Sequence, residues 1–230
     1  MRILRPTAPA VAGIVLLALA ACASPTATPT PTATAPAESP TPPPTPTSSA
    51  APDEVEVTAA VVVMTASTLA VFGTDGSTLA SVDYDMDGAA AVAQIAEALD
   101  EDPVVTPIDG DVESPCPPAT SYEFGGLQLR SPGSLWSVGA YEVIVTGATT
   151  AGGVGIETVA GQRIGVARSA FLTAIGEYLV LYDDSNRVGF DVLNPAAGPY
   201  DRIGVYSEFQ GGDLVYLAAP NLLGFIGSCA

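Results

Sequence analysis

The chain has 230 residues, and its 25 carboxylates against seven arginines give a formal net charge of −18. A field of this sign repels nucleic acids and anionic lipid headgroups, so we expect no nucleic-acid partner. The sequence lacks histidine and lysine altogether. This excludes Ser-His-Asp and Cys-His catalysis, His-ligated metals, Schiff bases and P-loop lysines, and no cofactor is indicated.

The first 21 residues have the order of an export signal. Arg2 and Arg5 precede an apolar stretch, residues 8–21, that is too short to span a bilayer comfortably as a permanent helix. The stretch ends Leu-Ala-Ala before Cys22, which resembles the lipobox of bacterial lipoproteins. The resemblance implies cleavage before Cys22, lipid on that cysteine and anchoring to the cell membrane on its extracytoplasmic face.

Residues 22–53 predict a linker, because Pro, Thr, Ala and Ser leave little apolar bulk to bury. Its proline content favours polyproline II at about 3.1 Å per residue, which gives a reach approaching ~90 Å. Residues 54–230 then predict one globular domain. This order of signal, stalk and domain is similar to that of uncharacterised actinobacterial lipoproteins.

The first half of the domain predicts strands and then an amphipathic helix. Apolar residues at i, i+3, i+4 and i+7 indicate a helix over residues 89–99, with Asp87 as its N-cap and Pro103 beyond its end. Gly and Asp mark turns between the β-branched runs. The predicted strands are residues 55–64, 68–72, 78–84, 120–124, 127–130 and 141–145.

The second half repeats this order of helix and strands. A short helix uses Ala170, Phe171, Ala174 and Ile175, after a strand over residues 156–159. Further strands are expected at residues 178–182, 188–193, 202–209 and 214–218. Hairpin-length connections favour an α+β fold, an antiparallel sheet with two short helices packed on it, built from two helix-plus-meander units.

The segment 161–176, a glycine-bounded turn into a short helix, resembles the unit found twice in β-lactamase-inhibitor-protein-like folds. It is also similar to small outer-membrane assembly lipoproteins. The resemblance implies a binding fold of the α+β class and transfers no functional residue.

The cysteine count indicates one disulfide. Lipidation of Cys22 would leave Cys116 and Cys229 as an even pair in an oxidising compartment. In the chain-entropy model, a loop of more than a hundred residues closed by this bond would add roughly 4 to 5 kcal/mol of stability. We therefore predict a Cys116–Cys229 disulfide.

Residues 83–88 match the first six positions of a D-x-D-x-D-G calcium loop, so Asp83, Asp85 and Asp87 are candidate metal ligands. The twelfth position is Gln94, where a bidentate carboxylate is needed. A strand end followed by a helix cap explains the same residues more simply.

The domain is expected to be a non-catalytic binding or interaction module of unknown ligand, anchored through lipid on Cys22 and displayed to an envelope protein or other ligand. The alternative is a carboxylate-only glycoside hydrolase acting on cell-wall or environmental glycan, which needs just two acids flanking a sugar bond. Seven acids within residues 97–113 predict a solvated loop, or a docking surface for a basic partner.

Overall fold

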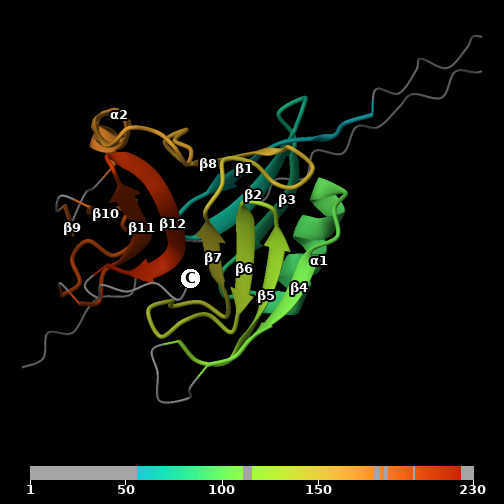
Figure 1. Cartoon of the computed structure of the whole chain (residues 1–230), viewed down its shortest axis with the longest axis horizontal. Helices are drawn as coiled ribbons and strands as arrows, with labels where there is room; N and C mark the ends of the chain where they lie inside the picture. The colour runs from blue at the N-terminus through green and yellow to red at the C-terminus, as the bar shows by residue number, and fades with distance from the viewer. Residues whose placement is uncertain (1–55, 111–115, 179–181, 184–185, 199, 224–230) are drawn as a thin grey trace, which may run out of the picture. The chain divides into compact units, whose positions relative to one another are not determined.

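Two β-sheets and two α-helices make up the described part of the chain, shown in Figure 1. The computed structural model describes residues 56–110, 116–178, 182–183, 186–198 and 200–223. The elements are β1 (Ala59–Met64), β2 (Thr68–Gly73), β3 (Thr78–Asp83), α1 (Gly88–Leu99), β4 (Val104–Ile108), β5 (Ala119–Phe124), β6 (Leu127–Ser131), β7 (Glu142–Val145), β8 (Gly155–Thr158), α2 (Arg168–Ala174), the 3₁₀ turn η1 (Ile175–Glu177), β9 (Tyr182–Asp183), β10 (Arg187–Phe190), β11 (Ile203–Gln210) and β12 (Asp213–Leu222).

The four-stranded sheet, here sheet A, has the order β3-β2-β1-β8. Its first three strands form antiparallel hairpins, with Thr74 to Ser77 as the second turn and Gly76 at a φ of +80°. Strand β8 then pairs with β1 in parallel, with Val62 opposite Ile156. Sheet A therefore joins segments about ninety residues apart in the chain.

The eight-stranded sheet, here sheet B, consists of two antiparallel meanders. Its order is β4-β5-β6-β7-β12-β11-β10-β9, so the last strand of each meander pairs with the last strand of the other. At this junction Ile144 on β7 lies opposite Ala218 on β12. Each meander follows a helix, α1 or α2, which confirms the predicted α+β class and its helix-plus-meander order.

Helix α1 forms where the sequence predicts it. The Asp87 carboxylate accepts a hydrogen bond from the Ala90 amide at 3.1 Å and so caps the first turn. The apolar face, including Val92 and Ile95, is buried in a core that both sheets share. At the other end Asp100 is a left-handed C-cap with a φ of 52°.

Helix α2 is short and is held by one aromatic cluster. Phe171 is fully buried and makes edge-to-face contacts with Phe190 and Phe209, at centroid distances of 5.3 and 5.2 Å. Ile175 in the following turn is also fully buried. The side chains of α2 thus contribute to the core over the second meander.

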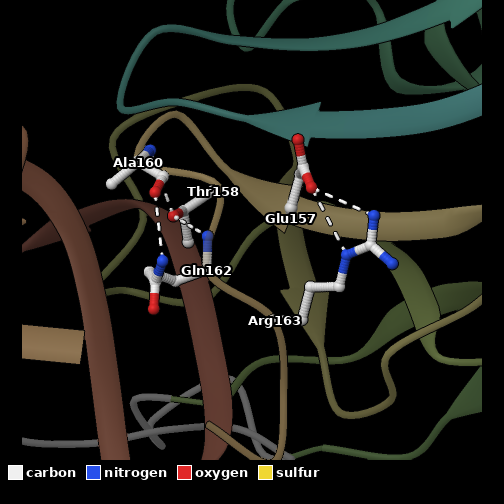
Figure 2. A network of polar contacts seen from close by, with 5 residues as sticks. All are labelled: Glu157, Thr158, Ala160, Gln162 and Arg163. Carbon is white, nitrogen blue, oxygen red and sulfur yellow. Dashed lines mark hydrogen bonds and ion pairs between the residues drawn. The ribbon is translucent and has the colours of Figure 1, made fainter. Parts of the chain in front are cut away.

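The segment between β8 and α2 links sheet A to sheet B. As Figure 2 shows, the Thr158 hydroxyl accepts hydrogen bonds from the Ala160 and Gln162 amides, and Arg163 pairs with Glu157 at 3.1 Å. Its backbone then reaches sheet B, where the Gly165 amide donates to the Leu214 carbonyl at 2.7 Å. This polar turn is a structural connection.

The structure differs from the sequence prediction in three places. Strand β4 was not predicted, the parallel β1–β8 pair was not expected from hairpin-length connections, and the strands form two sheets where one was expected. The strand predicted over residues 178–182 falls largely on residues 179–181, outside the described part of the chain. Within the described residues, no helix combines the length and apolar character needed to cross a membrane.

Candidate functional site

Of the three cysteines, only Cys116 lies within the described residues, and it is disulfide-bonded. Cys22 and Cys229 lie outside them. The pairing of Cys116 with Cys229 and the lipid on Cys22 therefore stay predictions.

The calcium-loop pattern is a helix cap in the structure. Asp87 uses its carboxylate to cap α1, and the Met86 amide donates to the Asp83 carbonyl at 3.0 Å to form a turn. Within the described residues there is no group of three or more Asp, Glu, Cys or His side chains that could hold a metal ion. Asp83 and Asp85 instead line a cleft on the surface.

Two hollows lie at opposite ends of sheet A. Strands β1 and β3 run in the same direction, because each is antiparallel to β2 between them. Their first residues, with the end of α1, line a groove of about 860 Å³, here the acidic groove. The turns after their last residues line a cleft of about 360 Å³, here the apolar cleft.

The acidic groove has apolar side chains in its lining and a rim of carboxylates. The apolar residues are Ala59, Ala80 and Ala98 together with Val57, Leu79, Leu99 and Val154. The rim carries four carboxylates, and three of them also line a smaller hollow beside it. They are Glu56, Glu97, Asp100 and Glu101.

Glu101 is the rim carboxylate that holds neighbouring structure. It accepts hydrogen bonds from the Thr150 hydroxyl at 2.5 Å and the Gly152 amide at 2.8 Å, so it fixes the β7–β8 loop. Of the seven acids between residues 97 and 113, Asp111 and Glu113 lie outside the described residues. Apart from Glu56, the acids that line the groove and the hollow beside it are the first four of that run.

The apolar cleft is assembled from six separate stretches of chain. They are the β1–β2 turn, the β3–α1 turn, the β6–β7 loop, the β10–β11 loop and one position on each of β11 and β12. The lining residues are Ala66, Ser67, Asp83, Tyr84, Asp85, Val138, Gly139, Leu193, Ile203 and Pro220.

Two buried tyrosines fix the walls of the cleft. The Tyr84 hydroxyl donates to the Thr65 carbonyl at 2.9 Å, and the Tyr141 hydroxyl donates to the Asp83 carbonyl at 3.1 Å. The two rings meet edge to face at 5.6 Å. Burial raises the pKa of both phenols well above the ordinary value, so both remain donors at neutral pH.

The β6–β7 and β10–β11 loops beside the cleft each form a hydrogen bond with a backbone group near a strand end of sheet A. The Asp191 carboxylate accepts a hydrogen bond from the Ala66 amide at 2.8 Å, with Asp191 itself at a φ of 52°. The Ala140 amide donates to the Tyr84 carbonyl at 2.8 Å. Gly139 packs so closely there that a Cβ would lie 2.5 Å from the Tyr84 carbonyl oxygen.

Large apolar side chains are exposed on both of these loops. Val138 and Leu193, which line the cleft, are 44% and 51% exposed. The same two loops also expose Leu135 and Tyr200, to 62% and 63%. Because large exposed apolar side chains that share one cleft, as Val138 and Leu193 do, are uncommon on soluble monomers, the apolar cleft is a candidate docking site.

A buried polar cluster supports the β6–β7 loop from the outer face of sheet B. Arg130 and Glu142 lie opposite each other on β6 and β7, and both are fully buried. Glu142 accepts hydrogen bonds from the Ser134 amide at 3.2 Å and the Asn221 side chain at 3.4 Å. Burial raises its pKa, which those hydrogen bonds and Arg130 partly oppose.

The sequence did not indicate the apolar cleft. Of its lining, only the acidic pair Asp83 and Asp85 was a candidate, and for a metal. Comparison of the chain with protein-family models, with curated proteins and with solved structures finds no match.

Proposed function

We propose that the protein is a lipid-anchored module on the extracytoplasmic face of the cell membrane that docks another envelope protein and catalyses no reaction. The single observation that carries the docking role is the apolar cleft with its exposed Val138 and Leu193. Anchor and location rest on the export signal and on Cys22. The stalk of residues 22–53 would display the domain away from the bilayer.

The cleft has the properties of a preformed interaction site. Its walls are fixed by the Tyr84 and Tyr141 hydrogen bonds and by the Asp191–Ala66 contact. Rigid apolar anchors bind at a lower entropic cost than flexible ones, because little conformational freedom remains to be lost. Removal of the exposed Val138 and Leu193 from water then supplies a favourable term of about 25 cal/mol per Å².

Photo-crosslinking in the membrane of the producing cells tests the proposal. A benzophenone amino acid in place of Leu193 should give an adduct of discrete mass, and the same group in place of Val104 should not. Val104 is a matched control, because it is 65% exposed on β4 and lines neither hollow.

Val138→Asn in the Leu193 probe should abolish the adduct, since a neutral amide would replace an apolar contact without changing the charge of the cleft. Val138 is 44% exposed, so the folded domain should tolerate the change. If no adduct forms at Leu193, or if Val138→Asn leaves it unchanged, the docking role at the cleft is wrong.

A further inference from the structure

We infer that the apolar cleft binds an extended segment of a protein in which an apolar side chain stands next to a lysine or arginine. This inference rests on the docking role proposed above and adds the chemistry of the partner. It is carried by the juxtaposition of an apolar cleft with two carboxylates, Asp83 and Asp85, in its lining.

The two carboxylates supply the charge. Both Asp83 and Asp85 are exposed, and within the described residues neither side chain has a hydrogen-bond or ion-pair partner. No arginine lines the cleft. A partner that covers this wall would strip water from two carboxylates, which is costly unless the partner brings a cation. Charge complementarity therefore favours a lysine or arginine at the edge of the cleft.

The backbone around the cleft disfavours a hydroxyl-rich ligand such as a glycan. The Asp83 carbonyl already accepts from the Tyr141 hydroxyl and the Met86 amide, and the Tyr84 carbonyl accepts from the Ala140 amide. The Ala66 amide donates to Asp191. Since these backbone groups are already paired, the unpaired side-chain acceptors among the described lining residues are the Asp83 and Asp85 carboxylates, whose charge a lysine or arginine neutralises and a glycan hydroxyl does not. An aliphatic or aromatic side chain suits the apolar part of the cleft.

The form of the surface favours a polypeptide over a small molecule or a bilayer. Leu135 and Tyr200 are also exposed on these two loops, outside the residues that line the cleft. A polypeptide can place an apolar side chain against Val138 and Leu193 and a neighbouring basic side chain against Asp83 and Asp85. The net charge of −18 repels anionic lipid, so a membrane surface is a poor occupant.

A peptide-display library tests the inference. Nine-residue peptides with random positions are selected against the full lipidated chain in nanodiscs of zwitterionic lipid. Peptides that also bind the Val138→Asn chain, in which the charge of the cleft is unchanged, are discarded. The survivors should be enriched in Leu, Ile, Phe or Met next to Lys or Arg.

Charge variants then measure the role of the two carboxylates. The double variant Asp83→Asn, Asp85→Asn should weaken the selected peptides about fivefold to tenfold, which corresponds to two exposed ion pairs. The matched control is Asp213→Asn, an exposed acid at the start of β12 that lines neither hollow. It should leave the affinity unchanged, and high salt should remove the difference.

The outcomes separate the two proposals. Selected peptides that depend on Val138 but lack basic residues, or that ignore the Asp83 and Asp85 changes, would overturn the inference and leave the docking role standing. A library from which no peptide depends on Val138 would overturn both. Melting curves confirm that each variant is folded before it is compared.

Discussion

At the apolar cleft, buried tyrosines and an aspartate tie two long loops to sheet A. The acidic groove instead has four carboxylates among apolar lining residues. The cleft keeps apolar side chains exposed on a rigid frame. Apart from Glu101, which holds the β7–β8 loop, the groove carboxylates are exposed to water, where a charge costs little. Solubility explains the groove carboxylates without any ligand, and the large apolar side chains exposed there, Val57 and Leu79, are less exposed, at 38% and 36%, than Val138 and Leu193 in the cleft. This difference is why the docking role is assigned to the cleft.

The largest expected effect tests the close packing beneath the cleft. Gly139→Ala would place a Cβ 2.5 Å from a backbone oxygen, so the loop must shift, at a cost of about 3 kcal/mol in the free energy of unfolding. Gly176→Ala is the matched control, because nothing lies within 4 Å of the added carbon. Urea unfolding measures both. Equal stabilities would show that the cleft frame is not tightly packed.

A smaller loss of stability is expected when the hydrogen bond that holds the β10–β11 loop is removed. Asp191→Ala leaves the partly buried Ala66 amide without its acceptor and places alanine at a positive φ, so we expect a loss of about 1 to 2 kcal/mol. Asp191→Asn keeps an acceptor and tolerates that backbone conformation, so it should lose less. Thermal denaturation separates the two. If the alanine variant matches the asparagine variant, the hydrogen bond is not what holds the loop.

The buried Glu142 behind the β6–β7 loop should produce a pH effect. Its pKa is raised, so the native state holds a proton more tightly than the unfolded state. The free energy of unfolding that it contributes is therefore lost as pH rises from its ordinary value of 4.5 toward the raised native pKa. The stability of Glu142→Gln relative to the natural chain should accordingly increase with pH.

Urea unfolding between pH 4 and pH 7 measures this difference. Glu97→Gln, at an exposed position of α1, is the control for the change in net charge. A difference between Glu142→Gln and the natural chain that is constant with pH would contradict the expectation.

The smallest effect is expected at the groove. Asp100 places a negative charge at the C-terminal end of α1, where the helix dipole is also negative. Asp100→Asn removes the charge and tolerates the left-handed cap, so it should stabilise the domain by about 0.5 kcal/mol. Thermal unfolding at low salt measures it. A destabilised variant would mean that Asp100, like Glu101, holds structure at the groove.

The sequence predicted local features better than distant pairings. Helix α1 and its Asp87 cap were predicted because spacing and capping lie within one short segment. Strand β4 was missed because it is short and contains Pro107, which cannot donate to a neighbouring strand. The parallel β1–β8 pair was missed because nothing near either strand specifies a partner ninety residues away.

The same reason explains why the site was not predicted. Gly139 and Tyr84 are more than fifty residues apart, and only the fold brings their backbones together. Asp191 was not singled out, because its role is to accept from an amide 125 residues away. Asp83 and Asp85 were noticed for their spacing, but spacing alone suggested a metal and gave no sign of the apolar side chains opposite them.

The β7–β12 junction suggests how such a domain could evolve and how a truncated chain could aggregate. Two four-stranded meanders that meet through their last strands have the topology of a two-fold symmetric dimer in which one surface pairs with its own copy. A single half of the domain could therefore recruit a second copy of itself through the same strand. A chain cut between the halves would expose that strand as an open edge, and we expect it to self-associate.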